Sequence, residues 1–508
     1  PQGAAPSEAD TRRVYLTPFY ISETGVADRM HTLLGAAKSI RRIDTDKAVS
    51  WVQQKLCITL ARNQVKAVRY ATENKVLIIT GGPGTGKTTL VSAILKIFSK
   101  ITTRIMLAAP TGRAAKRMSE TSGFPARTIH RLLEYSMQKG GFQKNSDKPL
   151  KCDLLIVDEA SMIPDAPSES SGGKSSSLLD DLMTFVYSGH KCQLMLIGDT
   201  AQLPPVKLSL SPALDAGKLS LGFGKDVMEV ELDEVVRQSR ESGILMNATR
   251  LREQLQLDPP PQFRFSLSGY ADIIRLVDGY EIQDAINEAF DTGGKEETAV
   301  IVRSNKRANL YNKNIRSRLL FLENQLATGD YMMVVKNNYF WLKSSSDAGF
   351  IANGDILEIL EIFAFKSLYG FSFAEVKVRM VDYPGQPPFE TVLLLDTLEA
   401  ETPSLSYEDS NRLYQEVMKD YQQERSGYKK FLAVKNNPFF NALQVKFSYA
   451  ITCHKAQGGQ WETVFVEQPY LSGKADREYL RWLYTAVTRA RNRLYLIGFH
   501  SDFFVMDE

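Results

Sequence analysis

The sequence predicts an α/β protein with two parallel sheets, and the order of its apolar segments is the main reason. In the first half, short apolar segments alternate with helical patterns, as expected when helices connect parallel strands. These segments span 75–80, 104–109, 152–157 and 193–197. A second set, at 297–302, 463–466 and 493–497, surrounds further helical patterns. We therefore expect a second α/β domain that is interrupted in sequence.

The interrupting stretch, between about 326 and 445, has a different pattern. From Ala374 to Met380, apolar residues alternate with charged residues, which is the period of a half-exposed strand. Pro384 and Gly385 then give a turn signal before an apolar segment at 391–395, so we expect an antiparallel hairpin. A helical pattern at 407–421 carries one apolar stripe, which we interpret as a packing surface.

Composition limits the class of protein. A chain of 508 residues is expected to form two to four domains. It contains no run of 18 apolar residues, and its first 13 residues lack the apolar core of a signal peptide, so we expect a cytoplasmic protein without a membrane partner. Four cysteines without C-x-x-C spacing argue against a zinc site or a disulfide scaffold. A net charge of +3 means that any site for a polyanion is local.

A glycine-rich segment between a predicted strand and a predicted helix fits the G-x-x-x-x-G-K-[ST] pattern of a phosphate-binding loop. Glycines let backbone N–H groups curl around phosphate oxygens, Lys87 adds a positive charge, and the Thr88 hydroxyl suits Mg²⁺. The alternative is an ordinary glycine-rich turn. The pattern therefore predicts binding of ATP with Mg²⁺ by the loop residues Gly82, Pro83, Gly84, Thr85, Gly86, Lys87, Thr88 and Thr89.

Polar residues follow two further predicted strands at the same edge of the first sheet. Asp158 and Glu159 end the strand at 152–157, where Asp158 would hold Mg²⁺ and Glu159 would orient or deprotonate the attacking water. An acidic pair at a strand end is otherwise a common solvated cap. Gln202 follows the strand at 193–197 and is placed to sense the γ-phosphate. Together with Lys87, these residues predict a nucleotide-hydrolysing site.

Several strings in a fixed order resemble the motifs of superfamily 1 helicases. The closest resemblance is to the RecD-like group of superfamily 1B, with likeness to the phage Dda and Pif1-like helicases as well. The strings extend over roughly 63–499, and several ordered motifs are more specific than any one alone. They are A-P-T-G-R-A-A from Ala109, T-I-H-R-L-L from Thr128, D-E-A-S from Asp158, G-D-T-A-Q-L-P-P-V from Gly198, V-R-Q from Val236, A-I-T-C-H-K-A-Q-G from Ala450 and Y-T-A-V-T-R-A-R from Tyr484.

The resemblance assigns further roles at the nucleotide site. It implies that Gln64 reads adenine and that Gln202 couples ATP to movement. Arg237 and Arg489 would reach the γ-phosphate from the second domain and neutralise charge during phosphoryl transfer. Gly458 falls in a string of the same site. Surface salt bridging is the alternative for both arginines.

The resemblance also implies a groove for single-stranded DNA across both α/β domains. The residues that would line it are Pro110, Thr111, His130, Thr452, His454 and Lys455. A histidine alone is more often a core or capping residue, and only the surrounding strings favour the DNA role. The stretch after His130 resembles a hairpin that acts as a pin against duplex DNA, so Phe142 or Tyr135 would meet the end base pair.

The implied fold is two RecA-like P-loop NTPase domains, each α/β, with two inserts and a short helical N-terminal segment. Residues 1–58 form a flexible start and the helical segment, and 59–235 form domain 1A with a pin-like insert at about 134–151. Domain 2A comprises 236–325 and 446–508. An SH3-like barrel, domain 2B, occupies 326–445 with a helical insertion at about 405–432.

The expected function is that of a monomeric, ATP- and Mg²⁺-dependent DNA helicase. It would move 5′ to 3′ on single-stranded DNA and act at single/double-strand junctions, with repair or recombination proteins as partners. One alternative is an RNA-directed superfamily 1 helicase, because contacts to phosphates discriminate poorly between the two nucleic acids. Another is a nucleotide-gated DNA-binding scaffold that does not unwind, which the intact catalytic strings disfavour.

Overall fold

The computed structural model describes most of the chain from residue 43 onward. The described residues are 17, 20, 24, 43–133, 136–138, 141–143, 152–165, 177–179, 181–182, 192–206, 208–216, 228–234, 241–258, 260–342, 348–471, 473 and 475–505. Arg237 and Tyr135 therefore lie outside the described residues, as does most of the predicted helical N-terminal segment.

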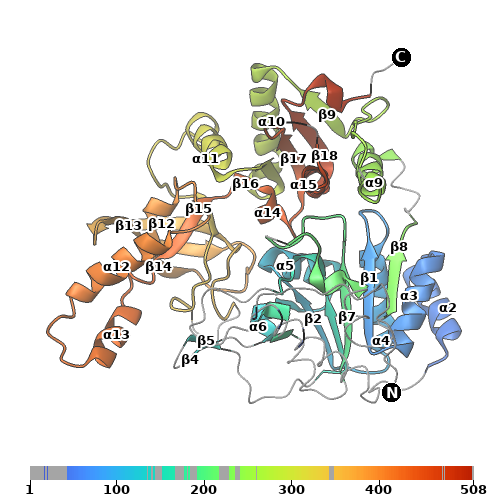
Figure 1. Cartoon of the computed structure of the whole chain (residues 1–508), viewed down its shortest axis with the longest axis horizontal. Coiled ribbons are helices and arrows are strands. Elements are labelled where there is room, and N and C mark those ends of the chain that lie inside the picture. Colours follow the sequence, from blue (N-terminus) through green and yellow to red (C-terminus); the bar gives the residue numbers. More distant parts are fainter. Residues whose placement is uncertain are drawn as a thin grey trace, which may run out of the picture.

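The first sheet is parallel throughout and has the strand order β3-β2-β6-β7-β1-β8. Its strands are β1 (Val76–Gly81), β2 (Ile105–Ala109), β3 (Ala126–Thr128), β6 (Leu154–Val157), β7 (Gln193–Gly198) and β8 (Met228–Leu232). The accompanying helices are α2 (Thr45–Leu56), α3 (Arg62–Glu73), α4 (Lys87–Phe98), α5 (Gly112–Ser122) and α6 (Ile129–Leu132). Figure 1 shows this sheet with its helices, which we call the first α/β unit.

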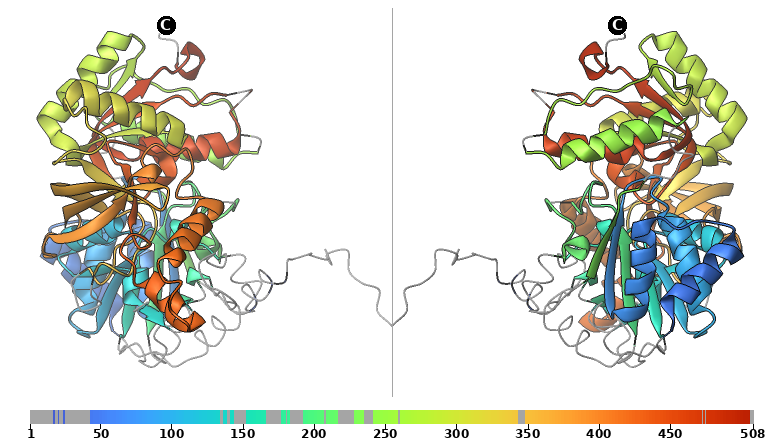
Figure 2. Two further views of the ribbon diagram at one scale, coloured as in Figure 1. Left: turned by 90° about the vertical axis from the view of Figure 1, so that its left-hand side faces the viewer. Right: turned by 90° about the vertical axis from the view of Figure 1, so that its right-hand side faces the viewer.

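The second sheet is also parallel, in the order β16-β10-β17-β18-β9. Its strands are β9 (Ile273–Leu276), β10 (Thr298–Val302), β16 (Ala450–Thr452), β17 (Trp461–Glu467) and β18 (Ala490–Ile497). The helices are α9 (Gly243–Leu255), α10 (Gly279–Glu297), α11 (Asn305–Asn314), α14 (Cys453–Ala456) and α15 (Arg477–Val487). We call this assembly the second α/β unit, which lies above the first in Figures 1 and 2.

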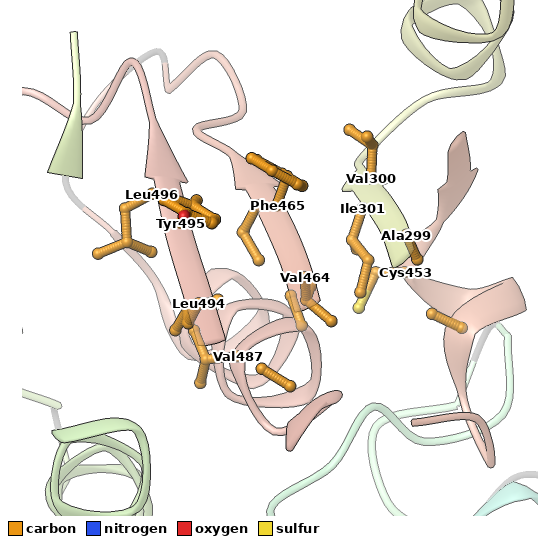
Figure 3. Close-up of a cluster of buried hydrophobic side chains, with 14 of the residues drawn as sticks. Ala299, Val300, Ile301, Cys453, Val464, Phe465, Val487, Leu494, Tyr495 and Leu496 are labelled. Carbon is orange, nitrogen blue, oxygen red and sulfur yellow. The ribbon is translucent and has the colours of Figure 1, made fainter. Parts of the chain in front are cut away.

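The core of the second unit joins segments that are far apart in sequence. Val464 and Leu494 lie on the central strands and share a fully buried cluster with Val487 of α15 (Figure 3). The rings of Phe465 and Tyr495 stack with centroids 4.6 Å apart. This packing holds the end of α15, and hence Arg489 just beyond it, against the sheet.

The predicted antiparallel insert is a closed five-stranded barrel. Its strands are β11 (Tyr331–Val334), β12 (Ile356–Leu368), β13 (Phe371–Met380), β14 (Phe389–Leu394) and β15 (Leu443–Phe447). The predicted hairpin is present as the antiparallel pair β13 and β14. Helices α12 (Tyr407–Lys419) and α13 (Gly427–Lys435) lie on the outside of the barrel in Figure 1. Leu413 and Val417 of α12 are buried against Phe373, so the apolar stripe is a packing surface as predicted.

A separate two-stranded antiparallel sheet follows α6. It pairs β4 (Ser136–Gln138) with β5 (Gly141–Gln143), which places Phe142 on a short hairpin. The role of this hairpin as a pin stays a prediction. Among the described residues, no helix combines the length and the apolar character needed to span a membrane. The four cysteines are free thiols.

Candidate nucleotide and nucleic-acid sites

The glycine-rich loop connects buried strand β1 to the start of α4. Gly84 and Gly86 adopt φ angles of +72° and +76°, which residues with a Cβ rarely adopt. The Lys87 ammonium donates to the carbonyl oxygens of Gly81 and Gly82 at 2.6 and 2.8 Å. Thr88 and Thr89 are exposed at the first turn of α4. The free N–H groups of a helix start make this loop suitable for binding phosphate.

Gln64 lies behind the loop and is buried. Its side-chain amide donates to the Thr85 carbonyl at 3.0 Å and accepts from the Ala61 N–H at 2.9 Å. Thr85 in turn donates its hydroxyl to the Gly82 carbonyl at 2.8 Å. In this arrangement Gln64 supports the loop backbone, whereas the reading of adenine stays a prediction.

The predicted acidic pair stands at the end of β6. Asp158 Oδ1 accepts the Glu159 N–H at 2.8 Å. Glu159 has a φ of +52°, a left-handed conformation that is uncommon for a residue with a side chain and is often found at functional sites. Burial, followed by the neighbouring Glu159 charge, raises the pKa of Asp158 to about 6. Arg117 of α5 lies 3.9 Å from Glu159.

Three carboxylates lie near the buried ammonium of Lys87. Burial lowers the pKa of Lys87, and Asp199, Glu159 and Asp158 oppose this change, in that order. Asp199, at the end of β7, is thus the strongest single opposing charge. Gln202 is buried three residues later, and no described residue donates to its Oε1. The loop, the acidic pair and Gln202 are therefore placed at one edge of the first sheet.

Arg489 of the second α/β unit is fully enclosed. Its guanidinium donates to the carbonyl oxygens of Thr485 and Gly459 at 2.9 and 3.2 Å, and to the Thr488 hydroxyl at 2.9 Å. Burial lowers the pKa of Arg489, and Glu159 of the first unit gives the largest opposing effect. Arg489 is thus oriented by its own unit with its charge near Glu159.

Residues in the motif strings of the two α/β units are hydrogen-bonded to each other. The Leu203 N–H donates to the Thr485 hydroxyl at 2.8 Å, and the Gln457 amide donates to the Leu203 carbonyl at 2.6 Å. Gly458 has a φ of +75°, and a Cβ built on it would lie 2.8 Å from Thr111 Oγ1. Only glycine fits this close approach, which brings the two predicted sides of the nucleic-acid groove together.

The predicted nucleic-acid residues differ in accessibility. Pro110 and Thr111 are half-buried before α5, and Thr111 caps that helix by accepting the Ala114 N–H at 3.3 Å. Thr452 is half-buried at the end of β16, and His454 is exposed. Burial lowers the pKa of His130 to about 4, so this half-buried side chain is neutral at pH 7.

Lys455 contacts the barrel. Its ammonium donates to Asn353 Oδ1 at 2.5 Å, and burial lowers its pKa to about 8. Asn353 stands two residues before Asp355, which pairs with Arg131 of α6 at 3.1 Å. Lys455 of the second unit and Arg131 of the first therefore both contact the loop that precedes β12.

Sequence reasoning did not find Arg252, an arginine that joins the two α/β units. Arg252 of α9 pairs with Asp199 and, at 2.8 Å, with Glu231 of β8. Tyr484 of α15 donates to Asp199 Oδ2 at 2.5 Å. Arg252 stands in no motif string, so only the structure identifies it. Asp199 and Tyr484 stand within the strings, which marked the region but gave neither a role.

Two family descriptions match parts of the chain. Residues 64–208 match an AAA domain, and residues 447–497 match a UvrD-like helicase C-terminal domain. The first covers the glycine-rich loop and the acidic pair, and the second covers the strings around Thr452 and Arg489.

The chain is also similar to proteins named as helicases. It is 34% identical over 236 residues to the ATP-dependent RecD2 DNA helicase of Deinococcus radiodurans, a match that covers 46% of this chain and 29% of that protein. It is 24% identical to the RecBCD enzyme subunit RecD of Buchnera aphidicola, covering 95% and 79% of the two chains. It is 28% identical to the ATP-dependent DNA helicase dda of Enterobacteria phage T4, covering 85% and 96%.

A solved Pif1 helicase structure aligns with 89% of this chain and 95% of its own, with a TM-score of 0.47 and 17% identity. The sequence matches and the ordered motifs make this chain similar to RecD-like helicases.

Proposed function

We propose that this chain is an ATP-dependent DNA helicase that moves 5′ to 3′ along single-stranded DNA and unwinds duplex DNA at junctions. The meeting of the strings of both α/β units next to the phosphate loop carries this proposal. A site made by two units responds to nucleotide by changing how they contact each other, which is what a motor requires. Action in repair or recombination, with partner proteins, belongs to the same proposal.

The site residues divide into two groups. Lys87 and the backbone of the glycine-rich loop would hold the phosphates of ATP, with Glu159 orienting the attacking water. Arg489, and Arg237 from outside the described residues, would stabilise the charge that develops on the γ-phosphate. Gln202 is buried with an open acceptor and would connect the nucleotide to Leu203, whose backbone bonds to the second unit.

The same residues suit Mg²⁺. Asp158 uses Oδ1 to accept the Glu159 N–H, and the Thr88 hydroxyl is exposed at the start of α4. Mg²⁺ prefers oxygen ligands and typically takes only one or two from the protein. Asp158 and Thr88 would therefore hold the ion, which when bound neutralises charge on the phosphates.

Movement along DNA would follow from alternate gripping by the two sides of the groove. Thr111 belongs to the first unit and Thr452 to the second, and Gly458 packs against Thr111. If ATP draws the units together and hydrolysis releases them, the two sides exchange their hold on the strand. The β4–β5 hairpin with Phe142 would stand against the duplex as a pin.

Strand separation on partial duplexes tests this function. We expect unwinding of a duplex with a 5′ DNA tail, no unwinding from a 3′ tail, and loss of both unwinding and DNA-stimulated ATP hydrolysis in Lys87→Ala. Unwinding from the 3′ tail alone would overturn the polarity. ATP hydrolysis without unwinding would favour a nucleotide-gated scaffold, and a preference for RNA tails would favour an RNA helicase.

A further inference from the structure

Arg252 reaches from the second α/β unit to the first and is held there by two carboxylates. One terminal nitrogen donates to Asp199 Oδ1, and the other donates to Glu231 Oε1 at 2.8 Å. Its side chain is 12% exposed. A guanidinium whose two ends are fixed in this way has a defined orientation, because the planar fork cannot rotate without breaking an ion pair.

The third donor group of this guanidinium faces the phosphate loop. A Cβ built on Gly82 would lie 3.2 Å from Arg252 Cδ and 3.7 Å from its Nε. The Arg252 Nε–H donates to neither carboxylate, and Tyr484 is a further side chain that interacts with the guanidinium. The Nε–H therefore faces the loop while the two carboxylates hold both ends of the guanidinium.

The position of Gly82 indicates which phosphate this donor would meet. The Lys87 ammonium bonds to the carbonyl oxygens of Gly81 and Gly82, so it lies at the same end of the loop as Arg252. The lysine of such a loop reaches the β- and γ-phosphates. Arg252 therefore lies at the terminal-phosphate end.

We propose that Arg252 is a further ATP-binding residue, which donates its Nε–H to an oxygen of the terminal phosphate while Asp199 and Glu231 hold its guanidinium in place. This inference rests on the proposed ATP-binding function of the glycine-rich loop. It explains why an arginine of the second unit is held by two carboxylates of the first.

The arrangement also connects this phosphate to the contact between the units. Asp199 accepts from Arg252 and, through its other oxygen at 2.5 Å, from Tyr484 of the second unit. Asp199 is 2% exposed, so the exchange of either partner for water is restricted. ATP, but not ADP, would thus add a bond between the two units through Arg252.

Equilibrium binding of two nucleotides to the full chain tests the inference. The probes are ADP and the non-hydrolysable ATP analogue AMP-PNP, each with Mg²⁺. In Arg252→Gln we expect affinity for AMP-PNP to fall about tenfold, the size expected for loss of a charge-assisted hydrogen bond, while affinity for ADP changes by less than about twofold. Equal weakening of both nucleotides would overturn the proposal, because it would indicate a packing role for Arg252.

Two further variants keep the test decisive. Arg250→Gln changes the same residue type on α9, and its side chain makes no ion pair with any described residue, so we expect both affinities to match the wild type. Tyr484→Phe removes the second bond to Asp199 together with the interaction of the Tyr484 hydroxyl with Arg252. Because both side chains act on Asp199, we expect its effect on AMP-PNP affinity to be non-additive with Arg252→Gln, and additive effects would contradict the shared contact.

The outcome for wild-type protein separates the two proposals. If wild-type protein binds neither nucleotide, the proposed function fails. If it binds both nucleotides and Arg252→Gln keeps the wild-type ratio of affinities, only the role of Arg252 fails. Retained thermal unfolding midpoints in each variant show that the comparison concerns folded protein.

Discussion

Two buried arginines join the first α/β unit to the rest of the molecule, and they are held in different ways. Arg131 of the first unit enters the barrel, where it donates to the backbone carbonyls of Ala348 and Phe350 and to Asp355. It also lies over the ring of Tyr383, 4.1 Å from the centroid. Arg252 of the second unit enters the first, where the carboxylates of Asp199 and Glu231 hold it.

This difference indicates which contact is fixed and which one responds to ligand. Arg131 is bound by backbone, ring and carboxylate together, and Asp355 is 1% exposed. The carboxylates that hold Arg252 include Glu231, whose side chain is 50% exposed. The barrel also has buried contacts with the second unit: Arg316 pairs with Asp330 at 2.9 Å, and Tyr331 shares the core of that unit. We therefore expect the contact of Arg131 with Asp355 to change less than that of Arg252 with its carboxylates when nucleotide changes the contact between the two α/β units.

The largest expected effect on the free energy of unfolding comes from breaking the contact between Arg131 and Asp355. Arg131→Met leaves the Asp355 carboxylate buried without a counter-charge, which should reduce the free energy of unfolding by about 3–5 kcal/mol. Urea unfolding followed by tryptophan fluorescence measures it, because Trp341 lies in the barrel region and donates to the Asn441 carbonyl.

The matched control is the double variant Arg131→Met with Asp355→Asn. Removing both charges avoids an unpaired buried carboxylate, so most of the lost free energy should return. A double variant as unstable as Arg131→Met alone would show that the loss comes from packing against Tyr383 rather than from the ion pair.

Asp355 should also give the barrel contact a pH dependence. Burial raises the pKa of Asp355 from 3.8 to about 6, although Arg131 opposes this. The folded state therefore binds the proton more tightly than the unfolded state. This contribution to stability is complete below pH 4 and is lost as the pH rises through 6, by up to about 3 kcal/mol.

Unfolding of the wild type and Asp355→Asn between pH 4 and 7 measures this contribution as the difference between the two curves. Comparison with the variant is necessary because Asp158 has a similarly raised pKa. Parallel curves would mean that Asp355 stays ionised in the folded protein throughout this range.

The sequence predicted the elements whose pattern is local. Buried parallel strands are continuous apolar segments, and the β13–β14 hairpin shows alternation, so both were visible without a structure. Strand β8 was missed because M-E-V-E-L alternates with glutamates and lies at the edge of the sheet. A short edge strand of this kind resembles a polar connection in sequence.

The residues of the candidate site were likewise predicted where their sequence pattern is local. Loop glycines, Lys87 and the acidic pair belong to short strings with fixed spacing, and these strings predicted their place at one sheet edge. Arg252 and Arg131 act through partners that are 53 and 224 residues away in sequence, Asp199 and Asp355. No local spacing encodes such a pair, because folding brings the partners together. Sequence reasoning therefore finds residues that bind a common ligand more readily than residues that join domains.

The contact of Arg252 with Asp199 and Glu231 should show a smaller effect, which concerns the pH dependence of ATP hydrolysis. Asp199 is the strongest charge that opposes the lowering of the Lys87 pKa. Asp199→Asn removes it, so the Lys87 pKa should fall further and the ammonium should lose its proton at lower pH. We expect the alkaline limb of the ATP hydrolysis rate against pH to move to lower pH.

Glu231→Gln is the matched comparison for this experiment. It removes the other, more exposed carboxylate that holds Arg252, and Glu231 is not among the groups that act on the Lys87 pKa. The alkaline limb should therefore stay in place in Glu231→Gln. An equal displacement in both variants would attribute the change to Arg252 rather than to Lys87.

The smallest effect concerns Lys455, which joins the second unit to the barrel through Asn353. Burial lowers its pKa to about 8, so it is cationic at pH 7 and loses its charge as the pH rises through 8. If it contacts a DNA phosphate, affinity for single-stranded DNA should weaken between pH 7 and 9. Lys455→Gln should remove this pH dependence and reduce the slope of log affinity against log salt by about 0.7.

Binding of a fluorescent oligonucleotide at several salt concentrations measures both quantities. Asn353→Ala is the control, because it removes the partner of Lys455 without removing the charge. If the Asn353 bond only orients the ammonium, this variant should keep the salt slope and weaken binding by a few-fold. A changed slope in Asn353→Ala with an unchanged slope in Lys455→Gln would place the phosphate contact on the barrel loop instead, and the barrel would then be part of the grip rather than its fixed support.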